Sequence, residues 1–99
     1  MRDVTVYYVP TCADSVATVS YLFLRGADVR LVNLEQHPDA AAAVRRAAGG
    51  DLATPTLEVE GEWFVTPAHT ELPGLLEQWG LPASAAPHEQ RGARSDRGA

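Results

Sequence analysis

Cysteine is almost absent from this sequence, because its 99 residues contain only Cys12. A single cysteine excludes an internal disulfide framework and a cysteine-rich zinc site. The three histidines, His37, His69 and His88, lack the spacing of metal ligands, and we expect no metal site. Any disulfide must therefore join this chain to another molecule.

Lysine is absent altogether, and eight arginines stand against thirteen acidic residues. Residues 1–81 alone carry five arginines against eleven acidic residues. No basic face is evident, so we expect no nucleic acid partner. Long apolar runs are also missing: none approaches the ~20 residues that span a bilayer, and Arg2-Asp3 leads into a strand-like segment without the apolar core of a signal peptide. We expect no membrane association and a cytoplasmic location.

The order of apolar and turn-forming residues predicts two strand–helix units, then a hairpin and a last helix. The expected strands are residues 4–9, 29–34, 56–60 and 62–66, and the expected helices are residues 13–25, 38–46 and those that follow Thr70. Glu60-Gly61 is the predicted hairpin turn. Residues 82–99 contain almost no large apolar side chain, and we expect a disordered C-terminal tail there.

Three of these elements carry more detailed expectations. The first strand is apolar on both sides, which predicts burial of both its faces. The first helix has apolar residues at mostly helical spacing: Val16, Val19, Tyr21, Leu22 and Phe23. The last helix has Thr70 as its expected N-cap and Pro73 in its first turn. It presents Leu72, Leu75, Leu76 and Trp79.

The element order is βαβ followed by ββα, which indicates an α/β protein. The first two strands should pair in parallel through a right-handed crossover, and the hairpin should add antiparallel strands. Burial of the apolar strands requires helices on both faces of one four-stranded mixed sheet. That architecture is the thioredoxin fold, and we expect residues 1–81 to form one such domain.

Cys12 lies between the first strand and the first helix, where unpaired backbone N–H groups and the helix dipole favour a negative charge. Such a position lowers the pKa of a thiol below its usual ~8.5 and makes it a nucleophile. The carboxylate of Asp14 would oppose this if it lay close to the sulfur. A lone cysteine is often only a small buried apolar residue, but Thr54-Pro55 directly before the third strand favours a reactive site.

Residues 6–15, VYYVPTCADS, resemble the active-site segment of glutaredoxins, and the resemblance extends over residues 4 to about 81. It implies that Pro55 is cis and packs beside Cys12, and that the backbone of Thr54 is free to pair with a bound thiol substrate. On this resemblance we assign catalysis to Cys12 and Ser15. We assign substrate binding to Thr11, Thr54, Pro55 and Thr66.

The chain departs from the family pattern in two ways. Ser15 stands where dithiol members have a second cysteine, which makes this a monothiol site whose mixed disulfide only an external thiolate resolves. Ser15 is open to two interpretations, donation to the thiolate or capping of a helical turn. Classical glutaredoxins bind glutathione through a lysine and a Gly-Gly pair. In this chain Val9 stands in place of the lysine and Val65-Thr66-Pro67 in place of the pair. The latter variation resembles mycoredoxin-like proteins of bacteria that use other small thiols.

These observations predict a monothiol thiol–disulfide oxidoreductase that acts through Cys12 on mixed disulfides between proteins and a low-molecular-weight thiol. We expect a monomer that needs no cofactor besides this small thiol as co-substrate. One alternative is an iron–sulfur cluster carrier in which two chains each donate Cys12, although Ala13 and Asp14 differ from the Gly-Phe of such proteins. Another is a redox-inactive module that binds a partner.

Overall fold

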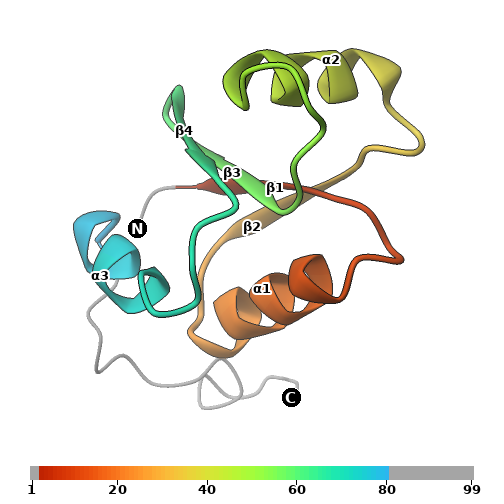
Figure 1. Ribbon diagram of the computed structural model, residues 1–99. Coiled ribbons are helices and arrows are strands. Elements are labelled where there is room, and N and C mark those ends of the chain that lie inside the picture. The colour runs from red at the N-terminus through yellow and green to blue at the C-terminus, as the bar shows by residue number, and fades with distance from the viewer. Residues whose placement is uncertain (1–2, 81–99) are drawn as a thin grey trace.

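The computed structural model describes residues 3–80 and contains four strands and three helices in those residues (Figure 1). Their order is β1 (Val4–Tyr8), α1 (Ala13–Leu24), β2 (Val29–Asn33), α2 (Pro38–Ala47), β3 (Thr56–Val59), β4 (Glu62–Val65) and α3 (Leu72–Gln78). The expected strands and helices are present; the four strands and the first two helices start where expected and end within one residue of the expected position. The predicted disordered tail at 82–99 lies outside the described residues.

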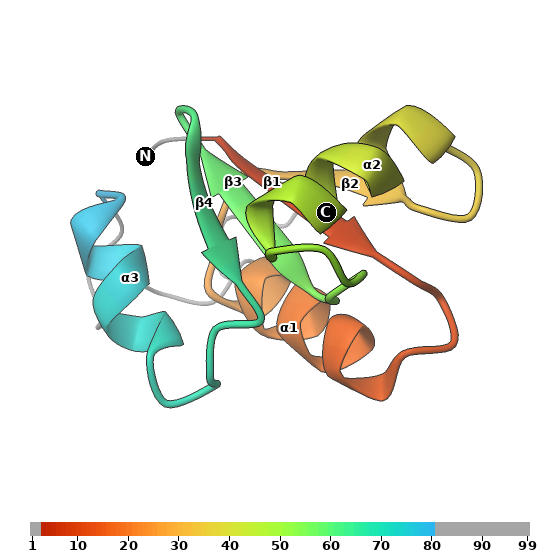
Figure 2. The same ribbon diagram turned by 45° about the horizontal axis from the view of Figure 1, so that its top comes forward.

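The four strands form one mixed sheet in the order β2-β1-β3-β4. β1 and β2 pair in parallel, whereas β1 with β3 and β3 with β4 pair antiparallel. Helices α1 and α3 cover one face of this sheet and α2 lies on the other (Figures 1 and 2). The βαβ-ββα thioredoxin fold predicted from the element order is confirmed.

The apolar core is divided by the sheet into two unequal parts. The larger cluster lies between the sheet and helices α1 and α3, and the smaller one packs Leu34 of the loop after β2 with Ala41 and Val44 of α2. In β1, Val4 and Val6 are fully buried toward the larger cluster, while Thr5, Tyr7 and Tyr8 are half-buried. The expected burial of both faces of β1 is therefore found only in part, because α2 covers only part of its face and the residues there are half-buried.

Helix α1 buries a face that the apolar pattern predicted only in part, since Leu22 is fully buried and Val19 and Tyr21 pack against the larger cluster. Ser15, Thr18 and Leu22 face inward and are 0% exposed, whereas Val16 is 51% and Phe23 is 44% exposed. The three inward residues are spaced by three and four positions and so share one side of the helix. Because two of them are polar, the helix brings hydroxyl groups into the interior next to Cys12.

The β3–β4 hairpin and α3 complete the larger core. Glu60 and Gly61 both have positive φ, 52° and 86°, as a two-residue type I′ turn requires. Helix α3 begins at Leu72 with Glu71 as its N-cap, so the expected cap at Thr70 is wrong. Leu72, Leu76 and Trp79 are buried, and Leu75 is half-buried. No helix among residues 3–80 is long and apolar enough to cross a membrane.

Candidate functional site

Cys12 is held at the N-terminus of α1 by the backbone of the loop that precedes it. Its N–H donates to the Val9 carbonyl at 2.9 Å, and its own carbonyl accepts from the Val16 N–H at 3.2 Å. Cys12 is the N-cap residue, with the extended dihedrals φ −90° and ψ 114°, and its side chain is partly exposed. The sulfur therefore lies at the positive end of the helix dipole and within reach of solvent.

Two further segments meet at this cysteine. The Cys12 thiol donates to the Thr54 carbonyl at 3.8 Å, a length within the range of a sulfur hydrogen bond. The Thr54-Pro55 peptide bond is cis, and the Pro55 carbonyl accepts from the N–H of Thr66 at 2.9 Å. Thr66 has φ 41°, which is unusual for a β-branched residue and turns the chain after β4 over Pro55.

Hydrogen bonds lower the pKa of the Cys12 thiol below the usual value for a cysteine. The largest cause is the side chain of Ser15, followed by the side chain of Thr54 and the backbone N–H of Ser15. Burial opposes the shift, and the backbone N–H of Asp14 adds to it. Asp14 thus acts on the thiol through its amide, and its carboxylate, which is exposed to solvent, is not among the causes of the shift.

The hydroxyl of Ser15 has an unusual environment. Its side chain is 0% exposed, and Oγ has no hydrogen-bond partner among the described residues while Cys12 is a thiol. α1 has no side-chain cap hydrogen bond, so Ser15 does not cap the helix. A buried O–H donor beside a thiol becomes satisfied when the thiol ionises, because the thiolate is an acceptor. This geometry favours donation to the thiolate, one of the two interpretations left open by the sequence.

A pocket of about 290 Å³ adjoins the cysteine. Three segments line it: α1 through Asp14 and Thr18, the loop before β3 through Thr54 and Pro55, and the loop after β4 through residues 66–69. The pocket reaches the cysteine through Thr54, whose carbonyl accepts from the Cys12 thiol. Thr54, Pro55 and Thr66 are thus brought together as predicted, whereas Thr11 is exposed and is not part of the pocket wall.

Comparison of the sequence with protein-family models agrees with this site. A model of the glutaredoxin family matches residues 4–65, from the start of β1 to the end of β4. The chain belongs to the glutaredoxin family. A search of the curated proteins finds no match. Family membership supports a thiol–disulfide oxidoreductase-like function, and the single cysteine fits a monothiol glutaredoxin.

His69 lies at this glutaredoxin site, although the sequence favoured an exposed loop histidine over a residue that approaches the site. Its side chain is exposed, as expected for a loop histidine, but its Nε2 lies 3.2 Å from Oγ1 of the fully buried Thr18. The two residues are 51 positions apart and both line the pocket. The only sequence signal was the position of His69 three residues after Thr66. Among residues 3–80 no group of three or more histidine, cysteine or acidic side chains could hold a metal ion.

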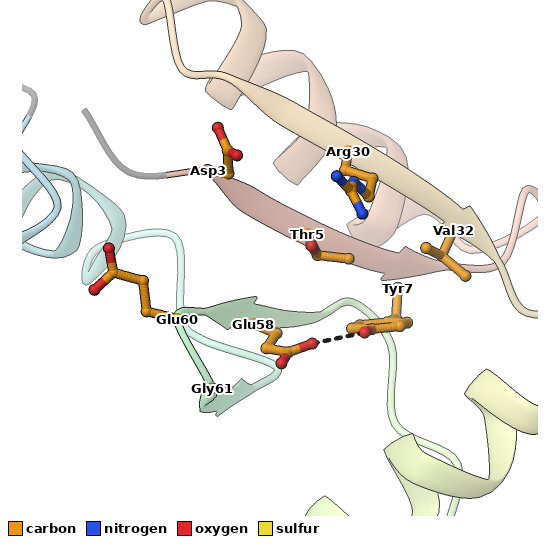
Figure 3. Close-up of a pocket in the computed structure, with 8 residues that line it drawn as sticks. All are labelled: Asp3, Thr5, Tyr7, Arg30, Val32, Glu58, Glu60 and Gly61. Atoms are coloured by element: carbon orange, nitrogen blue, oxygen red, sulfur yellow. Dashed lines mark hydrogen bonds between the residues drawn. The ribbon is translucent and has the colours of Figure 1, made fainter.

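A larger pocket, of about 470 Å³, lies on the opposite face of the sheet, beside the part that α2 leaves open (Figure 3). There the hydroxyl of Tyr7 donates to Glu58 Oε1 at 2.7 Å. Burial, the hydrogen bond and the charge of Glu58 raise the pKa of Tyr7 to about 12, and Arg30 partly offsets the shift. The smaller pocket is the better candidate for thiol chemistry, because Thr54, whose carbonyl accepts from the Cys12 thiol, lines it and does not line the larger hollow.

Proposed function

We propose that this glutaredoxin is a monothiol thiol–disulfide oxidoreductase that acts on mixed disulfides between proteins and a small thiol. The observation that carries the proposal is the partly exposed Cys12 thiol, whose pKa is lowered by hydrogen bonds from Ser15 and Thr54. A thiolate available near neutral pH is the nucleophile of disulfide exchange. Cys12 and Ser15 are the catalytic residues in this proposal.

The proposed reaction has two exchange steps. The Cys12 thiolate attacks the small-thiol sulfur of the mixed disulfide, a new S–S bond to Cys12 forms, and the protein thiolate leaves and takes a proton from solvent. The thiolate of a second small thiol then attacks the adduct, releasing the Cys12 thiolate and a disulfide of two small thiols. The net result is that one mixed disulfide is reduced to a protein thiol and one disulfide of two small thiols is formed. Neither step requires a second cysteine in the chain or a cofactor.

Substrate binding is proposed at the loop that precedes β3. Thr54 lies next to a cis proline and its carbonyl accepts from Cys12, so its backbone is available at the sulfur and not consumed by the sheet. Backbone groups that the sheet does not use can pair with a peptide or a peptide-like thiol by main-chain hydrogen bonds. Pro55 and Thr66 border the same pocket, and Thr11 precedes the cysteine on the exposed surface.

The small thiol is proposed to differ from glutathione. Val9 occupies the position of the family's glutathione-binding lysine, and Val65-Thr66-Pro67 occupies that of its Gly-Gly pair. These departures support a place among the mycoredoxin-like redoxins, which use other thiols. We further propose that the protein acts as a monomer in the cytoplasm.

A turnover assay tests this function. The reduced protein is incubated with a protein carrying a small-thiol mixed disulfide, and release of the reduced protein substrate is followed with and without added small thiol. We expect one equivalent of release without added thiol and repeated turnover with it, both abolished by Cys12→Ser. Absence of release at any thiol concentration would refute the proposal. Capture of a partner by Cys12→Ser without any release would instead favour a redox-inactive binding module.

A further inference from the structure

Helix α2 leaves part of its face of the sheet bare, and a hollow of about 470 Å³ lies there (Figure 3). The hollow extends over the parallel strands β1 and β2 and over β3. Parallel strands are usually covered on both faces. The volume falls within the ~300–1,000 Å³ typical of small-molecule sites. A small ligand therefore fits on this part of the sheet, and the charges around it decide which kind.

Opposite charges enter the hollow from its two sides. Thr5 of β1 pairs with Arg30 of β2 on one side and with Glu58 of β3 on the other. Directly opposite residues of neighbouring strands project to the same face, so a guanidinium and a carboxylate flank Thr5 (Figure 3). Two strand spacings put the Cα atoms of Arg30 and Glu58 about 10 Å apart. Within residues 3–80 the guanidinium of Arg30 has no hydrogen-bond or ion-pair partner.

The floor of the hollow is rigid and fixes the carboxylate of Glu58. The Tyr7 hydroxyl donates to Glu58 Oε1 at 2.7 Å, and the Tyr7 ring stacks on Trp63 with 5.2 Å between the ring centroids. The pKa of Tyr7 is raised to about 12, so the phenol keeps its proton and this hydrogen bond at neutral pH. A carboxylate accepts at both oxygens, which leaves Glu58 Oε2 for another donor.

A ligand with charge of only one sign would meet an opposing group in this hollow. An anion beside Arg30 would face the carboxylates of Glu58, Asp3 and Glu60, which also line the hollow. Asp28 adds another carboxylate in the smaller pocket on the far side of Arg30. A simple cation beside Glu58 would leave the guanidinium without a counter-ion. A ligand with both charges satisfies both sides, because the arginine fork binds a carboxylate and carboxylates accept from an ammonium group.

We propose that this hollow binds a small zwitterion of the dipeptide or ω-amino acid class. The ligand's carboxylate pairs with Arg30, and its ammonium group pairs with Glu58 and Asp3. Charges that enter from strands on either side of β1 suit ligand charges several bonds apart better than those of an α-amino acid. The half-buried hydroxyl of Thr5 hydrogen-bonds the middle of the ligand. The linings of this hollow and of the pocket beside the cysteine share no residue, so the site is separate from the exchange site.

Glycylglycine tests the site, with glycinamide and N-acetylglycine as matched probes that keep only its cation or only its anion. Each is titrated into the full ¹⁵N-labelled chain at pH 6.5 and low salt, and the backbone amide resonances are followed by NMR. We expect glycylglycine to shift the amides of Thr5, Arg30 and Glu58 with a Kd of about 1–10 mM. Each single-charge probe should bind about fivefold more weakly, and added salt should weaken the binding of glycylglycine.

Charge-neutral variants assign the two ends of the ligand. Arg30→Gln should remove the preference for glycylglycine over glycinamide, and Glu58→Gln should remove the preference over N-acetylglycine. Arg45→Gln on α2 and Glu62→Gln on β4 are the matched controls, because both side chains are exposed and neither lines the hollow. These two variants, and Cys12→Ser, should bind glycylglycine as wild type does.

The comparison of the three probes on wild type decides the inference even where a variant fails to fold. Equal shifts with all three probes would reveal a general ionic effect and overturn it. Stronger binding of either single-charge probe would overturn it too, as would glycylglycine shifts confined to amides outside the hollow or no shifts at all. Each of these results would leave the proposed exchange at Cys12 untouched, because the turnover assay does not depend on this site.

Discussion

Ser15→Ala should make the reduced protein more stable and its cysteine less reactive. In the thiol state Ser15 Oγ is fully buried without a partner among the described residues. An unsatisfied buried polar group costs about 1–3 kcal/mol, and alanine is the better helix former by a few tenths of a kcal/mol. The space left by one oxygen offsets part of this gain. We expect the free energy of unfolding to rise by about 1 kcal/mol.

The same substitution removes the largest cause of the lowered Cys12 pKa. A hydrogen bond to a charged group contributes about 1.5–3 kcal/mol when buried, and solvent screening at this partly exposed sulfur reduces it to about 1 kcal/mol. The rate of alkylation below the thiol pKa should therefore fall about fivefold. At high pH, where the thiol is ionised in both proteins, the two rates should converge.

Iodoacetamide alkylation from pH 5 to 10 measures the reactivity, and urea unfolding of the reduced protein measures the stability. Ser20→Ala is the matched control, because Ser20 is an exposed serine of the same helix, and it should change neither the alkylation profile nor any buried polar group. A Ser15→Ala protein that is destabilised while its alkylation profile stays unchanged would refute the reasoning. It would mean that the hydroxyl serves packing and not the thiolate.

Three other predictions follow from the same structure. Ser15→Cys should restore a Cys-x-x-Cys pair, so that a small thiol captured at Cys12 is released without external thiol, as mass spectrometry of the adduct would reveal. Tyr7→Phe should lower the free energy of unfolding by about 1 kcal/mol, because it removes the hydrogen bond to Glu58. In the variant, an alkaline absorbance titration should no longer contain the tyrosine of pKa about 12. Because this pKa is raised in the folded protein, the stabilisation by Tyr7 should be complete below pH 10 and should vanish as the pH rises toward 12. The Cys12 pKa is lowered in the folded protein, so ionisation of Cys12 should stabilise wild type relative to Cys12→Ser. This added stability should be complete above pH 9 and should disappear as the pH falls through the pKa of the folded protein.

Short-range patterns in the sequence were sufficient to predict the elements of this fold and the position of its cysteine. Glycine and proline mark the ends of the helices, and Glu60-Gly61 marks the hairpin, because these residues act on the local backbone. The N-cap of α3 was misplaced at Thr70, since the turn before it is closed by Glu71 and Ala68. The Glu71 carboxylate accepts from the N–H of Ala68, three residues earlier, and so competes with Thr70 for the capping role. Composition does not reveal this competition.

The sequence by itself determined that the site is monothiol, that the chain is acidic and that Cys12 starts a helix beside a strand, because each depends on residue identity or local backbone preference. Only the tertiary structure decided which side of α1 is buried, and with it the donor role of Ser15. It also decided that Thr18 and His69, 51 residues apart, share one pocket. Such contacts arise when the sheet order brings α1 and the loop after β4 together, and no local preference of either segment specifies them.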